Sequence, residues 1–536
     1  MPHLPEPAST HYDLIVIGTG PGGASLAHRL APTGLRILLL ERGQYLKRET
    51  GNWDSRVVFI DGRYQARETW HGADGSTFAP GLHYAVGGNS KVYGAALLRF
   101  RERDFDDVEH PDGLSPAWPL KYDAFEPYYA QAEALFHVHG RRGEDPTEPP
   151  ASTPFPFAPV EHEPRIAALD AQFRRHGVRP FHLPLGVLLD QAPDGSGRPL
   201  PTSPCIRCDA FDGFPCALNA KADAQVVCID PMLAAHDNVT LLTGAFASRL
   251  STDPGGRRVD AVHVTRDGQE ERYTADVVVS ACGALSSALL LLRSASAQHP
   301  DGLANGSGQV GRNYMRHHQS VLMALSRQPN DTVFQKTLAV SDYYFGTPDW
   351  PYPMGLIQMM AKSHPDQIRA EALPAWLEWL PDMPFDVMAR HALDFWLSSE
   401  DLPHPDNRIT LARDGRVTLA LREGKSEGHH RLRDQLKQLL RDADAHPQLM
   451  ERSLYLGKDI PVGGTAHQAG TARFGTDPRT SVLDLDCKAH ELDNLYVADA
   501  SFFPSIAAVN PTLTIIANAL RVADAIARRF GKAVAA

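Results

Sequence analysis

Two polar residues near the end of the 536-residue chain could carry out a reaction together, His467 and Asn510. A neutral imidazole can take the proton of an alcohol hydroxyl. An amide can hold the same oxygen, so that the carbinol C–H points towards a hydride acceptor. Because the chain contains 24 histidines, His467 is a candidate base only if a hydride acceptor lies beside it.

The N-terminal segment has the pattern of a dinucleotide-binding βαβ unit. It contains an apolar strand, a glycine turn, a helix and a second apolar strand, over 13–17, 18–23, 24–30 and 35–40. Gly18 permits the tight turn, Gly20 lets the backbone approach a pyrophosphate, and Gly23 lets the helix pack closely on the strand. The helix N-terminus would then face the phosphates. Glu41, after the second strand, is placed to bind the ribose of an adenosine. An α/β unit that binds nothing is the alternative.

The composition indicates a large globular protein that works on small molecules. A chain of 536 residues exceeds one ordinary core, so we expect two lobes. The formal charge of −11, with dispersed Lys and Arg, argues against nucleic acid as a partner. No apolar stretch is long enough to span a membrane. Residues 1–10 lack the basic and apolar regions of a signal peptide, so we expect a cytoplasmic protein.

The middle of the chain alternates between loop-like and regular segments. The glycine-rich segment 86–95 could let the backbone approach a flat ring, although an ordinary turn has the same composition. A helix punctuated by prolines is predicted over 118–136, and the proline-dense segment 145–159 is a candidate boundary between lobes. Segment 320–450 is rich in aromatic residues and Met, and its alternation suits an antiparallel sheet that caps a site.

An α/β pattern resumes after about residue 226. It predicts strands over 238–243, 258–264 and 270–273, with a hairpin turn at Asp267-Gly268. A further buried strand starts at Ala275 and runs through small residues into a helix over 288–294. Towards the C-terminus, a strand from Asn494 closes on Asp499, and a long helix is predicted over 512–530.

Cys205, Cys208 and Cys216 form the one cluster that could hold a metal or an iron–sulfur centre. They lack a clear fourth ligand, whereas a zinc or four-iron site requires four. We therefore predict no metal and favour buried thiols or a local disulfide. A metal cluster stays the alternative.

Four separated motifs, taken in order, resemble the glucose-methanol-choline (GMC) oxidoreductase family. They lie at 18–23, 86–95, 310–315 and 464–524. The resemblance implies an α/β fold with a Rossmann-like FAD-binding lobe built from discontinuous segments, and a substrate-binding lobe with an antiparallel sheet. The FAD-binding lobe would comprise 11–100, 205–318 and 464–536, and the substrate-binding lobe 101–204 and 319–463.

The resemblance also assigns roles to residues. His467 matches the family's catalytic histidine, and Asn510 matches its His-or-Asn partner. Asp499 and Ala500 would lie against the phosphate-ribityl part of FAD. The expected FAD-binding residues are Gly18, Gly20, Gly23, Glu41, Arg42, Gly88, Asn89, Ser90, Tyr93, Gly94, Ala95, Ala247, Ala281, Gly283, Asp499, Ala500, Asn510, Pro511 and Thr512.

Two departures from the family pattern lie in the second glycine segment. Some relatives attach FAD covalently through a histidine at the position of Val92, so we expect non-covalent FAD here. Tyr93 stands where many relatives have Asn, which changes the local flavin contacts.

These patterns predict FAD-dependent oxidation of an alcohol, with a sugar or glycoside as the substrate. Pyranose oxidases and bacterial glycoside 3-oxidases are the members closest in character, so oxidation at C2 or C3 is expected. Oxygen or another electron acceptor would then reoxidise the flavin. The alternatives are a choline, aryl or aliphatic alcohol as substrate, a flavin-containing hydroxynitrile lyase, and a flavin-binding protein without catalysis. The exact substrate, the electron acceptor and the oligomeric state stay open.

Overall fold

A mixed sheet of seven strands organises the N-terminal and C-terminal parts of the chain. The computed structural model describes residues 10–326, 328–372, 383–422, 424, 426–443, 448–451 and 465–534. Parts of the predicted segments 320–450 and 464–536 therefore lie outside the described residues. The strands of the sheet are β1 (His11–Ile17), β2 (Ile37–Leu40), β10 (Val239–Leu242), β11 (Phe246–Thr252), β12 (Val259–Arg266), β13 (Gln269–Ser280) and β23 (Leu495–Val497).

The strand order is β10-β2-β1-β13-β12-β11, and β23 pairs with the end of β13. Strands β10, β2, β1, β13 and β23 run parallel, as in a dinucleotide-binding fold. Strands β1 and β2 are almost wholly buried, which explains their continuous apolar runs. The parallel strands therefore bring their carboxyl ends, with the residues after them, to one edge.

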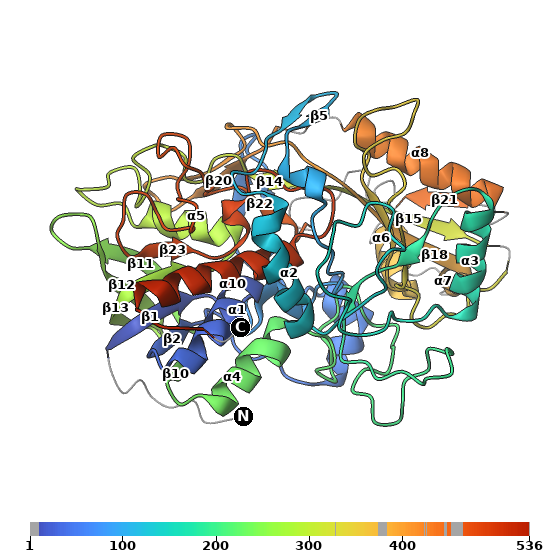
Figure 1. The fold of residues 1–536 in the computed structure, drawn as a ribbon, viewed down its shortest axis with the longest axis horizontal. Helices are drawn as coiled ribbons and strands as arrows, with labels where there is room; N and C mark the ends of the chain where they lie inside the picture. The colour runs from blue at the N-terminus through green and yellow to red at the C-terminus, as the bar shows by residue number, and fades with distance from the viewer. Residues whose placement is uncertain are drawn as a thin grey trace.

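The predicted βαβ unit is present at this edge. Strand β1 leads through Gly18 into helix α1 (Pro21–Leu30), and β2 pairs in parallel with β1. The helix begins at Pro21, earlier than predicted. Proline suits this position, because N–H groups in the first turn of a helix have no intrahelical partner and the missing N–H of proline costs no hydrogen bond. Helix α1 packs against α10 (Thr512–Arg529), which packs against α2 (Tyr122–Leu135), as Figure 1 shows.

Strand β13 differs from the prediction. The two strands predicted from 270 and from 275 are one strand of 12 residues, which pairs with β12 at its start and with β1 further along. The turn before it lies at Asp267-Gly268, as predicted, and both residues have positive φ. Helix α5 (Ala284–Arg293) begins directly after Gly283, earlier than the predicted 288. Gly283 has a φ of 85°, so the chain reverses there and the helix starts at once.

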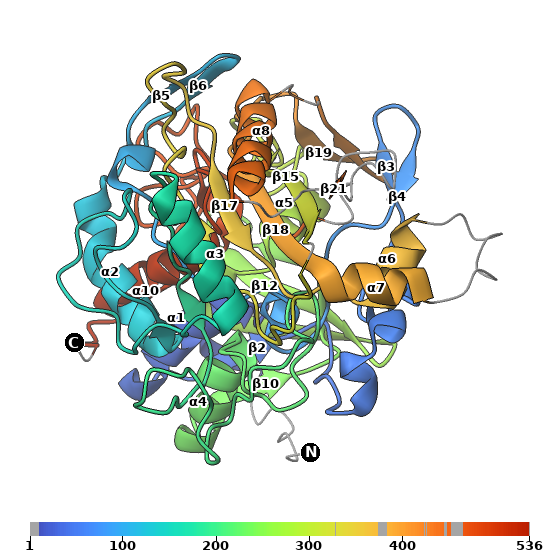
Figure 2. The same cartoon turned by 90° about the vertical axis from the view of Figure 1, so that its right-hand side faces the viewer.

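A six-stranded sheet, entirely antiparallel, forms the second layer of the fold. Its order is β21-β15-β18-β17-β16-β8, which confirms the sheet predicted within 320–450 for the described residues. Helices α3 (Pro164–Arg175) and α8 (Glu427–Asp442) pack on one face through a separate apolar cluster (Figure 2). The strands are β8 (Phe181–His182), β15 (His318–Leu325), β16 (Leu338–Val340), β17 (Leu356–Met359), β18 (Ala392–Ser399) and β21 (Gln448–Glu451). Helices α6 (Pro365–Ala372) and α7 (Met383–His391) pack on part of the opposite face through another apolar cluster, and the rest of that face lines a cavity shared with the first sheet.

Shorter elements connect these two layers. A four-stranded sheet places β3 (Trp70–Gly72) and β4 (Thr77–Phe78) beside β19 (Arg408–Leu411) and β20 (Val417–Ala420). No helix in the described residues is both long and apolar enough to cross a bilayer. The remaining elements are α4 (Asp230–Ala235), β5 (Val108–His110), β6 (Gly113–Ser115), β7 (Val138–His139), β9 (Leu185–Gly186), β14 (Met315–Arg316) and β22 (Gln468–Ala469), with helical turns at Ala31–Thr33, Thr50–Trp53, Arg56–Ile60, Gly88–Lys91, Glu102–Phe105, Gln225–Ile229 and Ala500–Phe502.

Candidate active site

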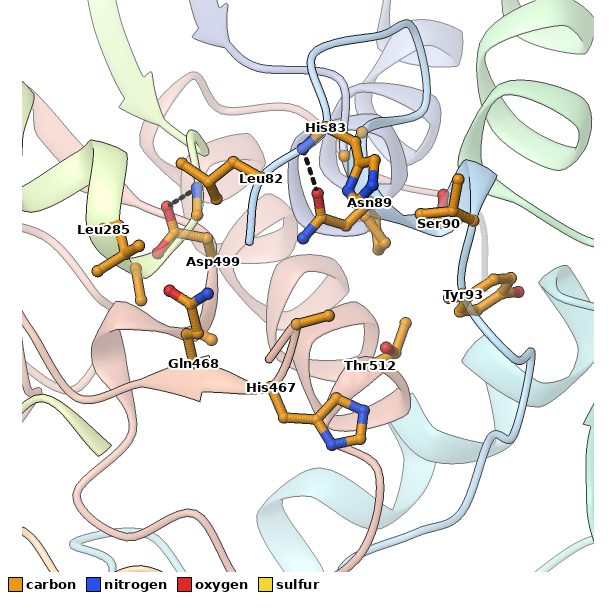
Figure 3. A pocket seen from close by; sticks show the side chains of 18 of the residues that line it. Leu82, His83, Asn89, Ser90, Tyr93, Leu285, His467, Gln468, Asp499 and Thr512 are labelled. Atoms are coloured by element: carbon orange, nitrogen blue, oxygen red, sulfur yellow. Dashed lines mark hydrogen bonds between the residues drawn. The ribbon is translucent and has the colours of Figure 1, made fainter. Parts of the chain in front are cut away.

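A cavity of about 710 Å³ extends from the ends of β1 and β2 to the face of the antiparallel sheet that carries Gln319, Val321 and Trp396. Its lining includes His467, Asn510 and every predicted FAD-binding residue except Gly23. Figure 3 shows Asp499 and Leu285 on one side of the cavity, Asn89, Ser90 and Tyr93 on another, and His467 below them. Residues from both ends of the sequence thus meet in one space.

Two glycine-containing turns, at Gly20 and Gly88, lie close together at one end of this cavity. Gly20 has a φ of −64°, which any residue can adopt, and a Cβ added there would meet no protein atom within 4 Å. That Cβ would project into the cavity, so glycine is needed there only for room. A Cβ on Gly88 would lie 3.0 Å from the Cα of Gly20, so the two turns face each other closely. A Cβ on Gly23 would lie 2.2 Å from the carbonyl oxygen of Gly18, which matches its predicted packing role.

Glu41 is buried at the end of β2 and accepts three hydrogen bonds. Its Oε2 accepts from the backbone N–H and the hydroxyl of Thr19 at 3.1 and 2.6 Å, and its Oε1 accepts from the N–H of Gly43 at 2.7 Å. Burial raises the pKa of Glu41, and these hydrogen bonds oppose that shift. The neighbouring Arg42 forms an ion pair with Glu68 and stacks on the ring of Tyr84 at 4.1 Å. Oε2 of Glu41 thus uses both of its lone pairs, and Oε1 keeps one for a ribose hydroxyl.

Three helices begin at the cavity wall, α1, α5 and α10. Their free N–H groups and positive dipole ends favour a bound phosphate. Asp499 holds the start of α5, because its Oδ2 accepts from the N–H of Gly283 at 3.0 Å and from the hydroxyl of Ser287 at 2.5 Å. Its Oδ1 accepts from Ser501. The open space at Gly20, the helix starts and the buried acid Glu41 together fit the diphosphate and adenosine of FAD.

The second glycine segment forms another wall of the cavity. Asn89 accepts a hydrogen bond from the N–H of His83 at 2.9 Å, and the Tyr93 hydroxyl donates to the carbonyl of Ala222 at 2.5 Å. The ring of Tyr93 can thus face the cavity while its hydroxyl is engaged elsewhere. Val92 lines the same wall with an aliphatic side chain.

His467 lies where β22 pairs with β14, and this pairing places it next to His317. The Nδ1 of His467 is 2.9 Å from the Nδ1 of His317 and 2.9 Å from the Nε2 of Gln319. Burial, together with the nearby His317 and the ammonium of Lys336, holds the pKa of His467 well below its usual value. The imidazole is therefore neutral near pH 7.

Asn510 precedes α10, and its side chain is held from the antiparallel sheet. Its Oδ1 accepts a hydrogen bond from the Nε2 of Gln358 at 3.1 Å. This contact leaves the Nδ2 of Asn510 to donate to another oxygen. His467 and Asn510 thus present a proton acceptor and a hydrogen-bond donor to the same cavity.

The face of the antiparallel sheet carries polar groups that the sequence analysis missed. Gln319 on β15, Gln358 on β17 and Trp396 on β18 line the cavity, and Gln358 lies directly opposite Trp396 in the sheet. The Oε1 atoms of Gln319 and Gln358 and the Nε1 of Trp396 are buried without a protein partner. Gln358 and Trp396 lie in a segment whose sequence is notable only for its Met and aromatic content. The alternation of side chains between the two faces of a strand is the signal that could have placed them on the cavity face.

A buried ion pair also lies beside the second glycine segment. The Nζ of Lys336 is 2.5 Å from the Oδ1 of Asp212, whose Oδ2 accepts from the N–H of Ala361 at 2.6 Å. A Cβ on Gly94 would collide with both Asp212 and Lys336, so this glycine allows the pair to approach the segment. The sequence analysis did not identify either residue, because they are 124 positions apart.

Cys205, Cys208 and Cys216 are free thiols in the structure, so the local disulfide is not formed. Burial raises the pKa of both Cys205 and Cys208 to about 11. Among the described residues, no group of three His, Cys, Asp or Glu side chains is arranged to hold a metal ion.

Comparison with known proteins identifies the family. Two GMC oxidoreductase models match residues 197–319 and 403–519, and a model of the NAD(P)-binding Rossmann-like domain matches residues 16–78. The chain is 33% identical to 6'''-hydroxyparomomycin C oxidase of Streptomyces lividus, over 98% of this chain and 92% of that protein. It is 32% identical to paromamine 6'-oxidase of Streptomyces fradiae, over 96% of this chain and 91% of that protein.

Solved structures agree on the fold. Pyridoxine 4-oxidase from Mesorbium loti has a TM-score of 0.61 at 18% identity, over 97% of this chain and 99% of that one. Formate oxidase from Aspergillus oryzae has a TM-score of 0.66 at 15% identity, over the same shares. The chain therefore belongs to the GMC oxidoreductase family. It is an FAD-dependent oxidoreductase that acts on the CH–OH group of its donor, which removes the alternative of a flavin-binding protein without catalysis.

Proposed function

We propose that this protein oxidises a hydroxyl group of a sugar or glycoside. The observation that carries the proposal is the polar wall made by Gln319, Gln358 and Trp396, which line the cavity with His467 and Asn510. Within this wall the Oε1 atoms of Gln319 and Gln358 and the Nε1 of Trp396 have no protein partner. A polyhydroxylated ring offers both donors and acceptors to such groups, whereas a simple alcohol would leave most of them unsatisfied. Two relatives are named as oxidases of aminoglycosides and a third, from Gluconobacter japonicus, as a fructose dehydrogenase, 26% identical over 96% of this chain and 97% of that protein.

In this proposal His467 is the general base. Its neutral imidazole takes the proton of the substrate hydroxyl, because its pKa lies below the working pH. FAD, when bound, supplies the acceptor for the hydride that leaves the same carbon. Asn510 donates from its Nδ2 to the substrate oxygen and orients the carbinol C–H. Lobe segments 11–100, 205–318 and 464–536 hold the cofactor, and 101–204 and 319–463 hold the substrate.

The charges near the sheet favour a neutral group at the reacting end. Lys336 and Asp212 are the charged residues of the cavity lining that lie there, and they neutralise each other. A quaternary ammonium such as choline needs an aromatic and carboxylate cage, and the carboxylate of Asp212 is already engaged by Lys336 and by the backbone. We therefore propose an uncharged sugar ring next to His467, with C2 or C3 as the expected position. A pyranose 2-oxidase of Tricholoma matsutake matches only 13% of the chain, so it adds little to the choice of carbon.

FAD is bound without a covalent link in this proposal. Val92 occupies the position at which some relatives carry a linking histidine, and an aliphatic side chain offers no nucleophile. Acid denaturation should release all of the flavin into solution. Flavin that stays with the precipitated polypeptide would contradict this point.

The test is an anaerobic titration of the purified protein with monosaccharides, glycosides, paromamine, choline and aryl alcohols. We expect neutral sugars or glycosides to bleach the flavin absorbance fastest, with the product carbon identified by mass spectrometry and NMR. Bleaching by choline or aryl alcohols without a response to sugars would refute the substrate class. No bleaching by any of the sugars or glycosides would also refute it.

A further inference from the structure

A second histidine contacts the proposed base and has no role so far. The ring of His317 lies edge-on to the ring of His467, with centroids 4.9 Å apart, and the two Nδ1 atoms are 2.9 Å apart. His317 is only 2% exposed, so water does not compete for its ring nitrogens. A hydrogen bond between two neutral imidazoles needs one donor and one acceptor, so the proton can be on only one of these Nδ1 atoms.

The other nitrogen of His317 decides which Nδ1 carries the proton. The Nε2 of His317 is 3.3 Å from the carbonyl oxygen of Ile506, and a carbonyl can only accept. Burial lowers the pKa of His317 to about 4, so this ring is neutral and has one proton. That proton is on Nε2, which leaves a lone pair on Nδ1. His467 must therefore donate from its own Nδ1.

Gln319 fits the same assignment once its amide is rotated by 180°. The amide atom assigned as Nε2 lies 2.9 Å from the Nδ1 of His467, while Oε1 is buried without a protein partner. The oxygen and nitrogen of an amide are nearly indistinguishable in shape, so their positions follow from the hydrogen bonds. With the oxygen turned to His467, the Nδ1–H has a second acceptor and the amide NH₂ takes the place of the unpartnered oxygen.

We infer that His317 is a positioning residue, which keeps the proton of His467 on Nδ1 and so keeps the lone pair of Nε2 available to the substrate hydroxyl. The inference rests on the proposed role of His467 as the base. In the opposite tautomer, Nε2 would carry the proton and could not accept another. When Nε2 takes the substrate proton, Nδ1 keeps its own, and His317 then accepts a hydrogen bond from an imidazolium, which is stronger than one from a neutral ring.

Charged groups face both rings and set the pH range of the test. The positive charge of Lys336 lowers the pKa of His467, whereas the negative charge of Glu400 raises the pKa of His317. Glu400 is itself engaged, because it accepts from the hydroxyl of Ser115 at 2.7 Å and lies 3.2 Å from the Nε2 of His110. Measurements at pH 7 to 8 therefore compare variants in which His317 and His467 start neutral.

Two substitutions separate the two nitrogens of His317. His317→Asn places an amide oxygen near the position of Nδ1 and keeps an acceptor for His467. His317→Gln places an amide nitrogen near the position of Nε2, so it keeps the donor to Ile506 but loses that acceptor. We expect His317→Gln to slow anaerobic flavin reduction at saturating sugar by roughly 10²-fold. Loss of the tautomer-fixing group of a catalytic triad costs ~10⁴-fold. The loss should be smaller here, because Gln319 can still accept a hydrogen bond from the Nδ1–H of His467. His317→Asn should retain most of the rate.

A double mutant distinguishes positioning from a general structural effect. If His317 acts through His467, adding His317→Gln to His467→Ala should cause no further slowing. His318→Gln is the matched control, because His318 follows His317 directly, begins β15 and lies near Asp401, outside the lining of the cavity that holds His467. It should reduce at the wild-type rate. FAD content and the melting temperature report whether each variant folds.

Each outcome has a separate meaning. An equal loss in the His467→Ala background would overturn the positioning role, and so would His317→Asn behaving like His317→Gln. If His467→Ala alone reduces at the wild-type rate, the proposed function of His467 fails instead. Because the single His467 variant is measured in the same series, these two failures are distinguishable.

Discussion

The two ends of the cavity are built in different ways. At the end formed by the parallel sheet, glycines, helix starts and backbone N–H groups make the wall, and Gly20 contributes nothing but room. At the end formed by the antiparallel sheet, side chains on three strands make the wall, among them Gln319, Gln358 and Trp396. The first end suits the diphosphate and ribose of a cofactor, because backbone N–H groups and helix starts contact it there. The second end suits a variable substrate, because single side chains can change without altering the fold.

The two residues proposed to react with the substrate, His467 and Asn510, belong to both ends of the cavity. His467 and Asn510 come from the C-terminal segment that completes the cofactor end, yet their side chains are held by Gln319 and Gln358 of the substrate end. The two proposed reacting groups therefore lie at the junction of the two ends. Changes at the cofactor end should abolish flavin binding, changes at the junction should slow reduction, and changes at the substrate end should alter selectivity.

The largest effect is expected at the cofactor end. Gly20→Leu should give protein almost free of FAD, because the side chain would fill the space in front of the turn while the backbone keeps its ordinary φ. The ratio of flavin to protein absorbance measures this loss. Gly255→Leu is the control, because Gly255 lies in an exposed turn away from the cavity and has only Asp253 near its Cβ position. A Gly20→Leu protein that purifies with full FAD would show that the turn does not approach the cofactor.

At the junction, His467→Ala should leave FAD bound and slow flavin reduction by roughly 10²–10⁴, the usual contribution of a positioned base. Stopped-flow reduction by an excess of sugar measures this rate. Reduction at the wild-type rate would exclude His467 as the base. The retained yellow colour serves as the internal control for folding.

The pH dependence of the wild type tests the same residue in another way. Only the neutral imidazole accepts a proton, so the rate falls as the pH drops through the pKa of His467 and is constant above it. Because burial lowers this pKa, the fall should lie below the usual histidine value of about 6.5. Anaerobic reduction rates measured from pH 5 to 8 show whether the midpoint lies below about 6.5. A midpoint above that value would contradict the neutral state of His467.

The difference between the two ends explains what could be predicted from the sequence. Gly18, Gly20 and Glu41 lie within one short segment, so their spacing alone predicted a βαβ unit that the structure contains. Short-range turn chemistry likewise predicted the turn at Asp267-Gly268. The helix α5 was predicted to begin too late, because a positive φ at Gly283 is not visible in an apolar pattern.

The substrate end could not be predicted in this way. Gln358 and Trp396 meet only because β17 and β18 pair in one particular register, and the sequence contains no local signal of that register. His317 follows closely after the family-like motif at 310–315, yet its contact with His467 spans 150 positions. The sequence indicated which segments form the sheet, but not which side chains face the cavity.

A smaller effect is expected for Asn510. Asn510→Ala removes one hydrogen bond to an oxygen that gains negative charge, so we expect a loss of about 1.5–3 kcal/mol, or roughly 10- to 150-fold in the reduction rate. The pH midpoint should not move, because an amide is not a base near neutral pH. Asn510→His should keep part of the activity, since its ring N–H can donate to the same oxygen. A normal rate in Asn510→Ala with a shifted midpoint would reverse the roles of the two residues.

The smallest effect is expected at the substrate end, where it should depend on the substrate. Trp396→Phe keeps an aromatic ring but removes the Nε1–H, which is buried without a protein partner, together with part of the indole ring, and this packing loss affects both substrates alike. If a sugar hydroxyl accepts from this N–H, its loss costs about 0.5–1.5 kcal/mol, which raises the apparent Kd of the sugar roughly 2- to 13-fold beyond the packing loss. A small aliphatic alcohol has no second hydroxyl to reach Trp396, so its apparent Kd should show the packing loss alone. Titrations of both substrates against the wild type and the variant give the ratio of the two changes. An equal change for the sugar and the small alcohol would mean that Trp396 supports the cavity only by packing. Selectivity at the substrate end would then have to come from Gln319 and Gln358.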